Sequence, residues 1–250
     1  MFFTKADRWL MNNLIDRKRI FEVNLNECRD EFGGRYGEKN NHFFVKALAA
    51  GPNRSNMIDV LKDYYSKNPI KSFNSVIGRD TGHPSGKCYF LPWEKERVRP
   101  LEKFITSHKV GPTPDFALHG ILDRLCKVYH SLKTSGFNQF WRFDGYIRLI
   151  RYESSDRKAG FFVRDGNHRM TCLSYLGHTK VLGCLESEHF QNSKFFRLAA
   201  RVARKPLYVY PKISVVRESD VLEWPHVKAG NVSAKDALEF FRKKINETYN

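Results

Sequence analysis

Residues 161–185 read FFVRDGNHRMTCLSYLGHTKVLGCL, and the expected fold is predicted mainly from this stretch. The residues from Gly160 to Arg164 predict a short strand, which Asp165-Gly166 ends. Apolar residues then recur at helical spacing from His168 to Leu176. The segment from Thr179 to Leu185 predicts another strand. We therefore expect a strand, a loop, a helix and a strand in succession.

The flanking sequence extends this pattern on both sides. A long amphipathic helix is expected between Thr113, as its cap, and the stop signal Gly136. A strand is expected from Tyr146 to Tyr152. Downstream, we expect a basic helix over residues 192–204, a strand over 207–216 and a final helix. Ser233 and Asp236 form a capping box at the start of that final helix.

These elements predict an α+β or α/β fold, with a small mixed sheet around residues 145–185 and helices before and after it. The expected regions are a helical and irregular N-terminal part (1–112), a core (113–190) and C-terminal helices with a strand (191–250). Residues 1–65 are expected to be mostly helical. The glycine-rich segment Phe32 to Gly37 is interpreted as a flexible turn.

Composition leaves the class of protein broad. The 250 residues are 41% hydrophobic, which is enough to bury a core. The five cysteines include no C-x-x-C pair, so neither a disulfide framework nor a zinc ribbon is expected. No stretch approaches the roughly 20 apolar residues that cross a bilayer, and the start lacks a signal-peptide pattern, so we expect a cytoplasmic protein without a membrane span. The net charge of +16 favours an anionic partner.

The loop Asp165-Gly166-Asn167-His168-Arg169 combines groups that suit a phosphate. The first N–H groups of a helix have no internal partner, and the helix dipole favours an anion there. Gly166 allows close approach of a ligand, and Arg169 can hold phosphate oxygens in a bidentate fashion. His168 can donate to a phosphate or exchange a proton, and Asp165 can hold Mg²⁺ or accept a hydroxyl proton.

An ordinary turn is the alternative, because Asp165 or Asn167 could simply cap a helix. The combination of all five residues, with a strand on either side and a helix stop at Gly177, favours a functional loop.

The residues from Val163 to Arg169, followed by Leu173 and by Leu176-Gly177-His178, resemble the signature of the ParB/sulfiredoxin superfamily. Upstream, Leu132 to Gln139 resembles the helix end and turn that precede the next strand in that superfamily. Sulfiredoxins carry a catalytic cysteine just before the His-Arg pair. Asn167 stands at that position in this chain, which argues against sulfiredoxin chemistry.

The resemblance implies that Gly166, Asn167, His168 and Arg169 bind the phosphates of ATP or ADP, with Mg²⁺ held at Asp165. The form D-G-x-H-R is closest to that of the free-serine kinases of the superfamily. In those enzymes an acidic residue elsewhere in the chain acts as base.

Three acidic residues are candidates for that base, because they lie outside the regular core: Glu22, Glu31 and Asp80.

Three functional hypotheses remain open. The first is a phosphotransferase that acts on a small-molecule or sugar-containing acceptor, with Asp165 and His168 as catalytic residues. The second is a nucleotide-gated or nucleic-acid-binding protein of ParB type. No helix-turn-helix pattern follows Leu185, so any DNA binding is expected to be weak and without sequence preference. The third is a domain that keeps the fold without catalysis.

Overall fold

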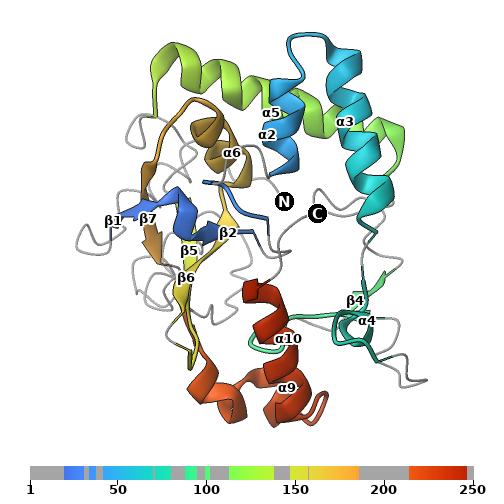
Figure 1. Ribbon diagram of the computed structural model, residues 1–250, viewed down its shortest axis with the longest axis vertical. Helices are drawn as coiled ribbons and strands as arrows, with labels where there is room; N and C mark the ends of the chain where they lie inside the picture. The colour runs from blue at the N-terminus through green and yellow to red at the C-terminus, as the bar shows by residue number, and fades with distance from the viewer. Residues whose placement is uncertain are drawn as a thin grey trace, which may run out of the picture.

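The computed structural model describes residues 20–30, 34–37, 42–69, 71–79, 88–94, 99–101, 113–137, 147–156, 158–185 and 214–246. Within these ranges the chain has an α+β fold, as the sequence predicts. One mixed six-stranded sheet lies between two groups of helices (Figure 1).

The sheet has the order β1-β7-β5-β6-β2, and β8 pairs with the second half of β5. Its strands are β1 (Ile20–Asn24), β2 (Cys28–Arg29), β5 (Ile147–Glu153), β6 (Ala159–Asp165), β7 (Lys180–Leu185) and β8 (Val215–Arg217). The two strands expected on either side of the loop, β6 and β7, therefore belong to one sheet, with β5 between them. β5 is antiparallel to β6 and parallel to β7.

The helices on one side of the sheet are α2 (Phe43–Ala49), α3 (Arg54–Lys67), α5 (Asp115–Ser135) and α6 (Asn167–Tyr175). The other side carries α4 (Phe73–Val76), α9 (Pro225–Lys228), α10 (Ala234–Asn246) and the hairpin of β3 (Cys88–Tyr89) and β4 (Arg99–Pro100). Two 3₁₀ helices, η2 (Leu25–Glu27) and η5 (Glu218–Glu223), complete the described elements.

Both faces of the sheet are buried. Along β5, Ile147 and Leu149 pack into the core beneath α5 and α6, while Ile150 and Tyr152 pack into the second core around α10. Successive side chains of a strand point to opposite faces, so one strand supplies both cores. The loop between β6 and α6 thus starts from a strand that is fixed on both sides.

Most predicted elements near the loop are confirmed, with shifts of one or two residues at their ends. α5 begins at Asp115 with Pro114 as its N-cap, so Thr113 does not cap it as predicted. Half of the predicted capping box of α10 is present: the Asp236 N–H donates to Ser233 Oγ over 3.1 Å, while the Asp236 carboxylate pairs with Arg79.

The N-terminal region differs from the prediction. Helix was expected there, but residues 20–24 form β1, which pairs with β7 along its whole length. Ile20, Phe21 and Val23 are β-branched or aromatic residues that favour strands, a local signal that the helical prediction overlooked. The sheet therefore takes β1 and β2 from the region 1–112 and β8 from 191–250, as well as strands from 113–190. The predicted basic helix at 192–204 lies outside the described residues.

Glu218 links three parts of the second core. Its carboxylate accepts hydrogen bonds from Ser154 Oγ (2.9 Å) and the Ser155 N–H (2.8 Å) in the turn between β5 and β6, and from Arg242 Nε (2.7 Å) on α10. Burial alone would raise the pKa of this carboxyl, but these donors outweigh it and lower the pKa to about 2. The ionised form therefore stabilises the folded state.

All five cysteines are free. Burial raises the pKa of the Cys28 thiol to about 12, so this thiol stays protonated at neutral pH. Among the helices in the described ranges, none combines the length and apolar character needed to cross a bilayer.

Candidate functional site

The turn from β6 into α6 is built around Gly166. Asp165 is the last residue of β6, and Gly166 follows with φ 102° and ψ 16° as the N-cap of α6. A Cβ atom at this position would lie 2.7 Å from Ile147 Cδ1. Only glycine meets both the positive φ and the close approach to β5, so the turn requires the residue found there.

The start of α6 has no side-chain cap. Neither Asp165 nor Asn167 fills that role, so the plain capping alternative does not describe this helix. The first backbone bond of the helix runs from the Met170 N–H to the Gly166 carbonyl over 2.8 Å. The N–H groups of the three preceding residues belong to the first turn, where a helix offers no internal acceptor.

Asp165 forms an ion pair with Arg148 at the start of β5, with Oδ2 2.7 Å from Nη2. Both side chains are about half exposed. Burial would raise the pKa of the Asp165 carboxyl, but Arg148, Arg169 and the Gly166 N–H together lower it. Asp165 is therefore an anion at neutral pH.

A bulge places this ion pair. Arg148 pairs with Asp165 and Leu149 pairs with Val163, so Arg164 is an extra residue on β6. Bulges of this kind redirect side chains at strand ends. Here the extra residue brings Asp165 into register with Arg148 immediately before the loop.

Arg169 lies on the other side of the turn. Its side chain is buried, and Nη2 comes within 3.3 Å of the Cβ position of Gly166. The positive charge of Arg169 also helps to lower the pKa of Asp165. Two arginines from different elements thus flank the uncapped helix start.

His168 turns away from the ion pair and into the helical layer. Its ring lies 5.0 Å from the ring of Phe44 on α2, and its Nε2 atom is buried. A role in phosphate binding or proton exchange would therefore fall to Nδ1.

Asn167 contacts a segment that the sequence pattern did not connect with it. The hydroxyl of Tyr36 donates a hydrogen bond to Asn167 Oδ1, and Ser174 Oγ of the same helix donates to the Tyr36 carbonyl. Tyr36 is fully buried, so the described part of the glycine-rich segment is packed rather than a free turn. No periodicity or motif could have shown this pairing, because 131 residues separate Tyr36 and Asn167.

The structure separates one of the proposed second acids from the loop. Glu22 lies on β1, three strand spacings from β6, which corresponds to roughly 14 Å. Its carboxylate pairs with Lys180 over 2.8 Å. Glu31 and Asp80 lie outside the described residues.

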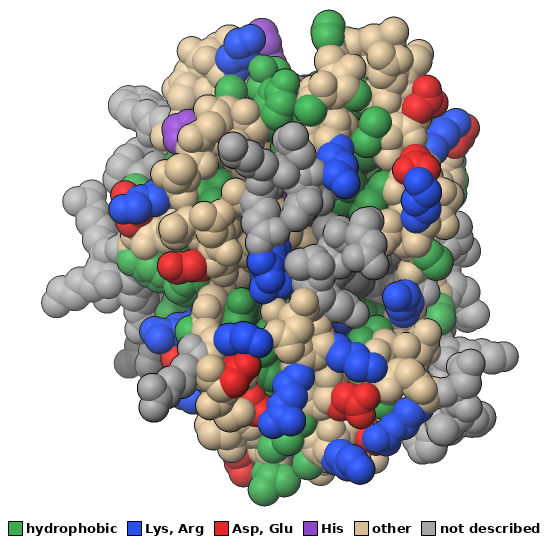
Figure 2. Space-filling view, viewed as in Figure 1, with side chains coloured by type: hydrophobic (Ala, Val, Ile, Leu, Met, Phe, Trp, Pro, Cys, Tyr) green, Lys and Arg blue, Asp and Glu red, His purple; other side chains and the backbone are tan. Residues whose placement is uncertain are grey.

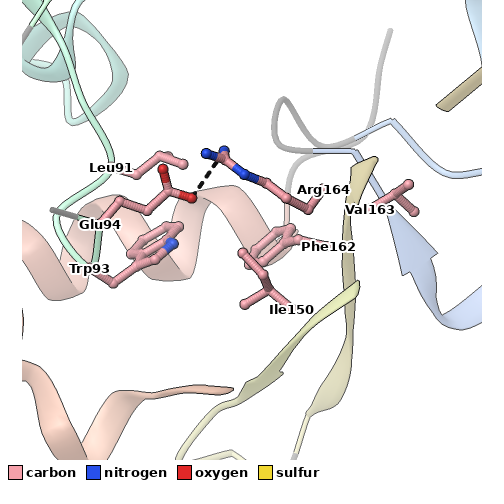
Figure 3. A pocket seen from close by; sticks show the side chains of 7 residues that line it. All are labelled: Leu91, Trp93, Glu94, Ile150, Phe162, Val163 and Arg164. Atoms are coloured by element: carbon pink, nitrogen blue, oxygen red, sulfur yellow. Dashed lines mark ion pairs between the residues drawn. The ribbon is translucent and has the colours of Figure 1, made fainter. Parts of the chain in front are cut away.

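Another acidic residue, Glu94, contacts the strand that leads into the loop. Its Oε1 lies 3.1 Å from Arg164 Nη1, and its side chain is largely buried. Figure 3 shows this ion pair above Trp93, Phe162 and Ile150, beside a small pocket of about 10 Å³. The pocket lies on the face of the sheet that carries the second core.

The surface charges on the face in Figure 2 are mixed. Lysines and arginines are interspersed with acidic side chains around α10. Several are paired, including Arg79 with Asp236 and Lys243 with Glu239. In the parts of the chain that the structure describes, no group of three His, Cys, Asp or Glu side chains could hold a metal ion.

Comparison of the chain with protein-family models, with curated proteins and with solved structures gave no match.

Proposed function

We propose that this protein binds the phosphates of a nucleotide, ATP or ADP, at the loop between β6 and α6, and that it is a phosphotransferase. The acceptor would be a small molecule or a sugar-containing compound. The proposal also rests on the resemblance of residues 163–178 to the phosphate-binding loops of the ParB/sulfiredoxin superfamily.

One observation carries the phosphate site: Arg148, paired with Asp165, and Arg169, beside Gly166, flank a helix start that has no side-chain cap. Arg148 and Arg169 supply guanidinium donors, and the first turn of α6 supplies N–H donors together with the helix dipole. In the structure, the Asp165 carboxylate is the anion that pairs with Arg148. A phosphate group offers the same cations more charge and more acceptor oxygens than this carboxylate does.

Asp165 fits a metal-holding role better than a proton-accepting one. Its lowered pKa keeps the carboxylate charged at neutral pH and makes it a weak base. Magnesium is usually held by one or two carboxylates together with substrate phosphates, and Asp165 would supply one such ligand. The bound ion would neutralise phosphate charge, while Arg148 would move from Asp165 to a phosphate oxygen.

The test is a thermal-shift screen of the full chain against ATP, ADP, pyrophosphate and adenosine, each with and without Mg²⁺. Ligand at 100 times its Kd stabilises a protein by about 2.7 kcal/mol. We expect pyrophosphate and the nucleotides to raise the melting temperature, and adenosine to have little effect. Equal shifts with ADP and adenosine, or no shift with any of the four, would remove the basis of the phosphate site.

The transfer reaction needs a separate assay. ADP release from ATP is measured with pools of hydroxyl-bearing acceptors, and the phosphorylated product is identified by mass spectrometry. Binding without ADP release for any acceptor pool would leave a nucleotide-binding protein and reject the phosphotransferase.

A further inference from the structure

The segment Gly34–Gly37 is fixed by its own contacts before it reaches α6. The Gly34 N–H donates to Asp30 Oδ1 over 3.0 Å, and the Tyr36 N–H donates to the Cys28 carbonyl over 3.5 Å. A Cβ atom at Gly37 would lie 2.4 Å from the backbone nitrogen of Asn26. The segment therefore lies directly against β2 and η2, and its position is set by backbone contacts.

The ring of Tyr36 is held in one orientation. It stacks on His42, with 4.6 Å between ring centroids and 19° between planes. His42 in turn caps α2, because its Nδ1 accepts from the Phe44 N–H over 3.3 Å, and its Nε2 lies 3.6 Å from Asp30 Oδ2. Tyr36, His42 and Asp30 are each at most 1% exposed. The position of the Tyr36 hydroxyl is thus fixed by the packing of its ring.

That hydroxyl donates to Asn167 Oδ1, which holds the amide oxygen toward Tyr36. The oxygen and the nitrogen of an amide point in different directions from the same carbon atom. While Tyr36 donates to Oδ1, the NH₂ group faces another way and keeps its two donors for a ligand. An amide free to rotate would offer either group, and its carbonyl oxygen would repel a phosphate.

We infer that Tyr36 is a positioning residue: it acts through Asn167 and makes the loop select ligands that only accept hydrogen bonds, such as an ionised phosphate. This inference rests on the proposed phosphate site. It raises the expected contribution of Asn167 to phosphate affinity, since a neutral amide would otherwise be the most replaceable member of the loop. It also gives a function to a tyrosine that lies far from the loop in sequence.

The first test uses Tyr36→Phe, which keeps the stacked ring and removes only the hydroxyl. Affinity for pyrophosphate and ADP is measured by calorimetry in wild type, Tyr36→Phe, Asn167→Ala and the double variant. Loss of one uncharged hydrogen bond predicts an affinity about threefold to tenfold lower for Tyr36→Phe. In the Asn167→Ala background, Tyr36→Phe should cause no further loss, because its effect passes through the amide. Tyr89→Phe is the matched control, since Tyr89 is a buried tyrosine of the other core.

A second variant does not depend on the tyrosine. Asn167→Asp keeps an oxygen that accepts from Tyr36 but replaces the NH₂ donor by a negative charge, so affinity should fall at least tenfold while the protein stays folded.

The outcomes separate the two proposals. If wild type binds neither pyrophosphate nor ADP, the phosphate site and the inference both fail. If Arg169→Ala loses affinity while Tyr36→Phe and Asn167→Asp bind like wild type, only the inference fails. Equal losses from Tyr36→Phe with and without Asn167 would also overturn it, because they would show that the tyrosine acts by another route.

Discussion

Replacing Asp165 by asparagine should strengthen phosphate binding rather than weaken it. The change keeps the size of the side chain and removes the negative charge that now pairs with Arg148 over 2.7 Å. A phosphate on the first turn of α6 would lie about 5 Å from this carboxylate, where two unit charges repel by about 1 kcal/mol in a water-like medium and about 3 kcal/mol at an effective dielectric constant near 20. Asp165 is half exposed, so the lower figure applies. It corresponds to about fivefold tighter binding.

The assay is a titration of pyrophosphate and ADP into wild type and Asp165→Asn, first in EDTA and then in Mg²⁺. In EDTA the variant should bind about fivefold more tightly, as worked out above. With Mg²⁺ it should lose the part of the affinity that the ion adds, and phosphate transfer should slow. Asp156→Asn is the control, because Asp156 is an equally exposed, lysine-paired carboxylate in the turn that precedes β6, and the strand between that turn and Asp165 is about 20 Å long. Weaker binding of folded Asp165→Asn in EDTA would show that the Asp165 charge does not repel a phosphate bound at the loop.

Three further predictions concern the fold and the surface. Glu218→Gln should destabilise the protein by about 2 kcal/mol at neutral pH. Because the folded pKa of Glu218 is lowered from 4.5 to about 2, the difference in stability between variant and wild type should shrink as the pH falls through that range. Chemical denaturation at several pH values measures this difference. Gly166→Ala should lower the folding stability by about 1–3 kcal/mol and weaken phosphate binding. Gly120→Ala, within α5 and with open space around the position, should raise the folding stability by about 0.5–1 kcal/mol. Melting curves with and without ADP compare the two variants. Binding to duplex DNA should be weak, independent of sequence and abolished by salt in anisotropy titrations, and tight sequence-selective binding at raised salt would favour the ParB-type hypothesis.

The sequence predicted the elements around the loop because their signals are local. Turn residues and apolar spacing are enough to place β6, α6 and β7, and the stop at Gly177 has the expected positive φ. The prediction missed the N-terminal strands. Ile20, Phe21 and Val23 favour a strand locally, but β1 is only five residues long and β2 only two, and their pairing with β7 and β6 exists only in the folded chain.

In the candidate site, too, the features with local sequence signals were predictable and the long-range contacts were not. The turn at Gly166 could be predicted, since it depends on neighbouring residues, whereas the sequence left open whether Asp165 or Asn167 caps α6. The partners of the loop could not, because Arg148 and Tyr36 reach it through strand register and packing. The orientation of His168 against Phe44 is likewise a product of the packing of α6 on α2.

The most direct test of the phosphate site is the affinity of Arg169 and Arg148 variants for pyrophosphate and ADP. Loss of a charge-assisted contact worth about 1.5–3 kcal/mol predicts roughly 10- to 150-fold weaker binding for Arg169→Ala. Because Arg169 is buried, Arg169→Ala could fail to fold, so Arg169→Lys and Arg148→Ala are measured as well. Arg217→Ala is the control, since it removes an arginine that is paired with Glu153. We expect weaker binding for all three loop variants and unchanged binding for the control. If folded Arg169→Ala and Arg148→Ala bind both ligands as wild type does, the loop is not a phosphate site.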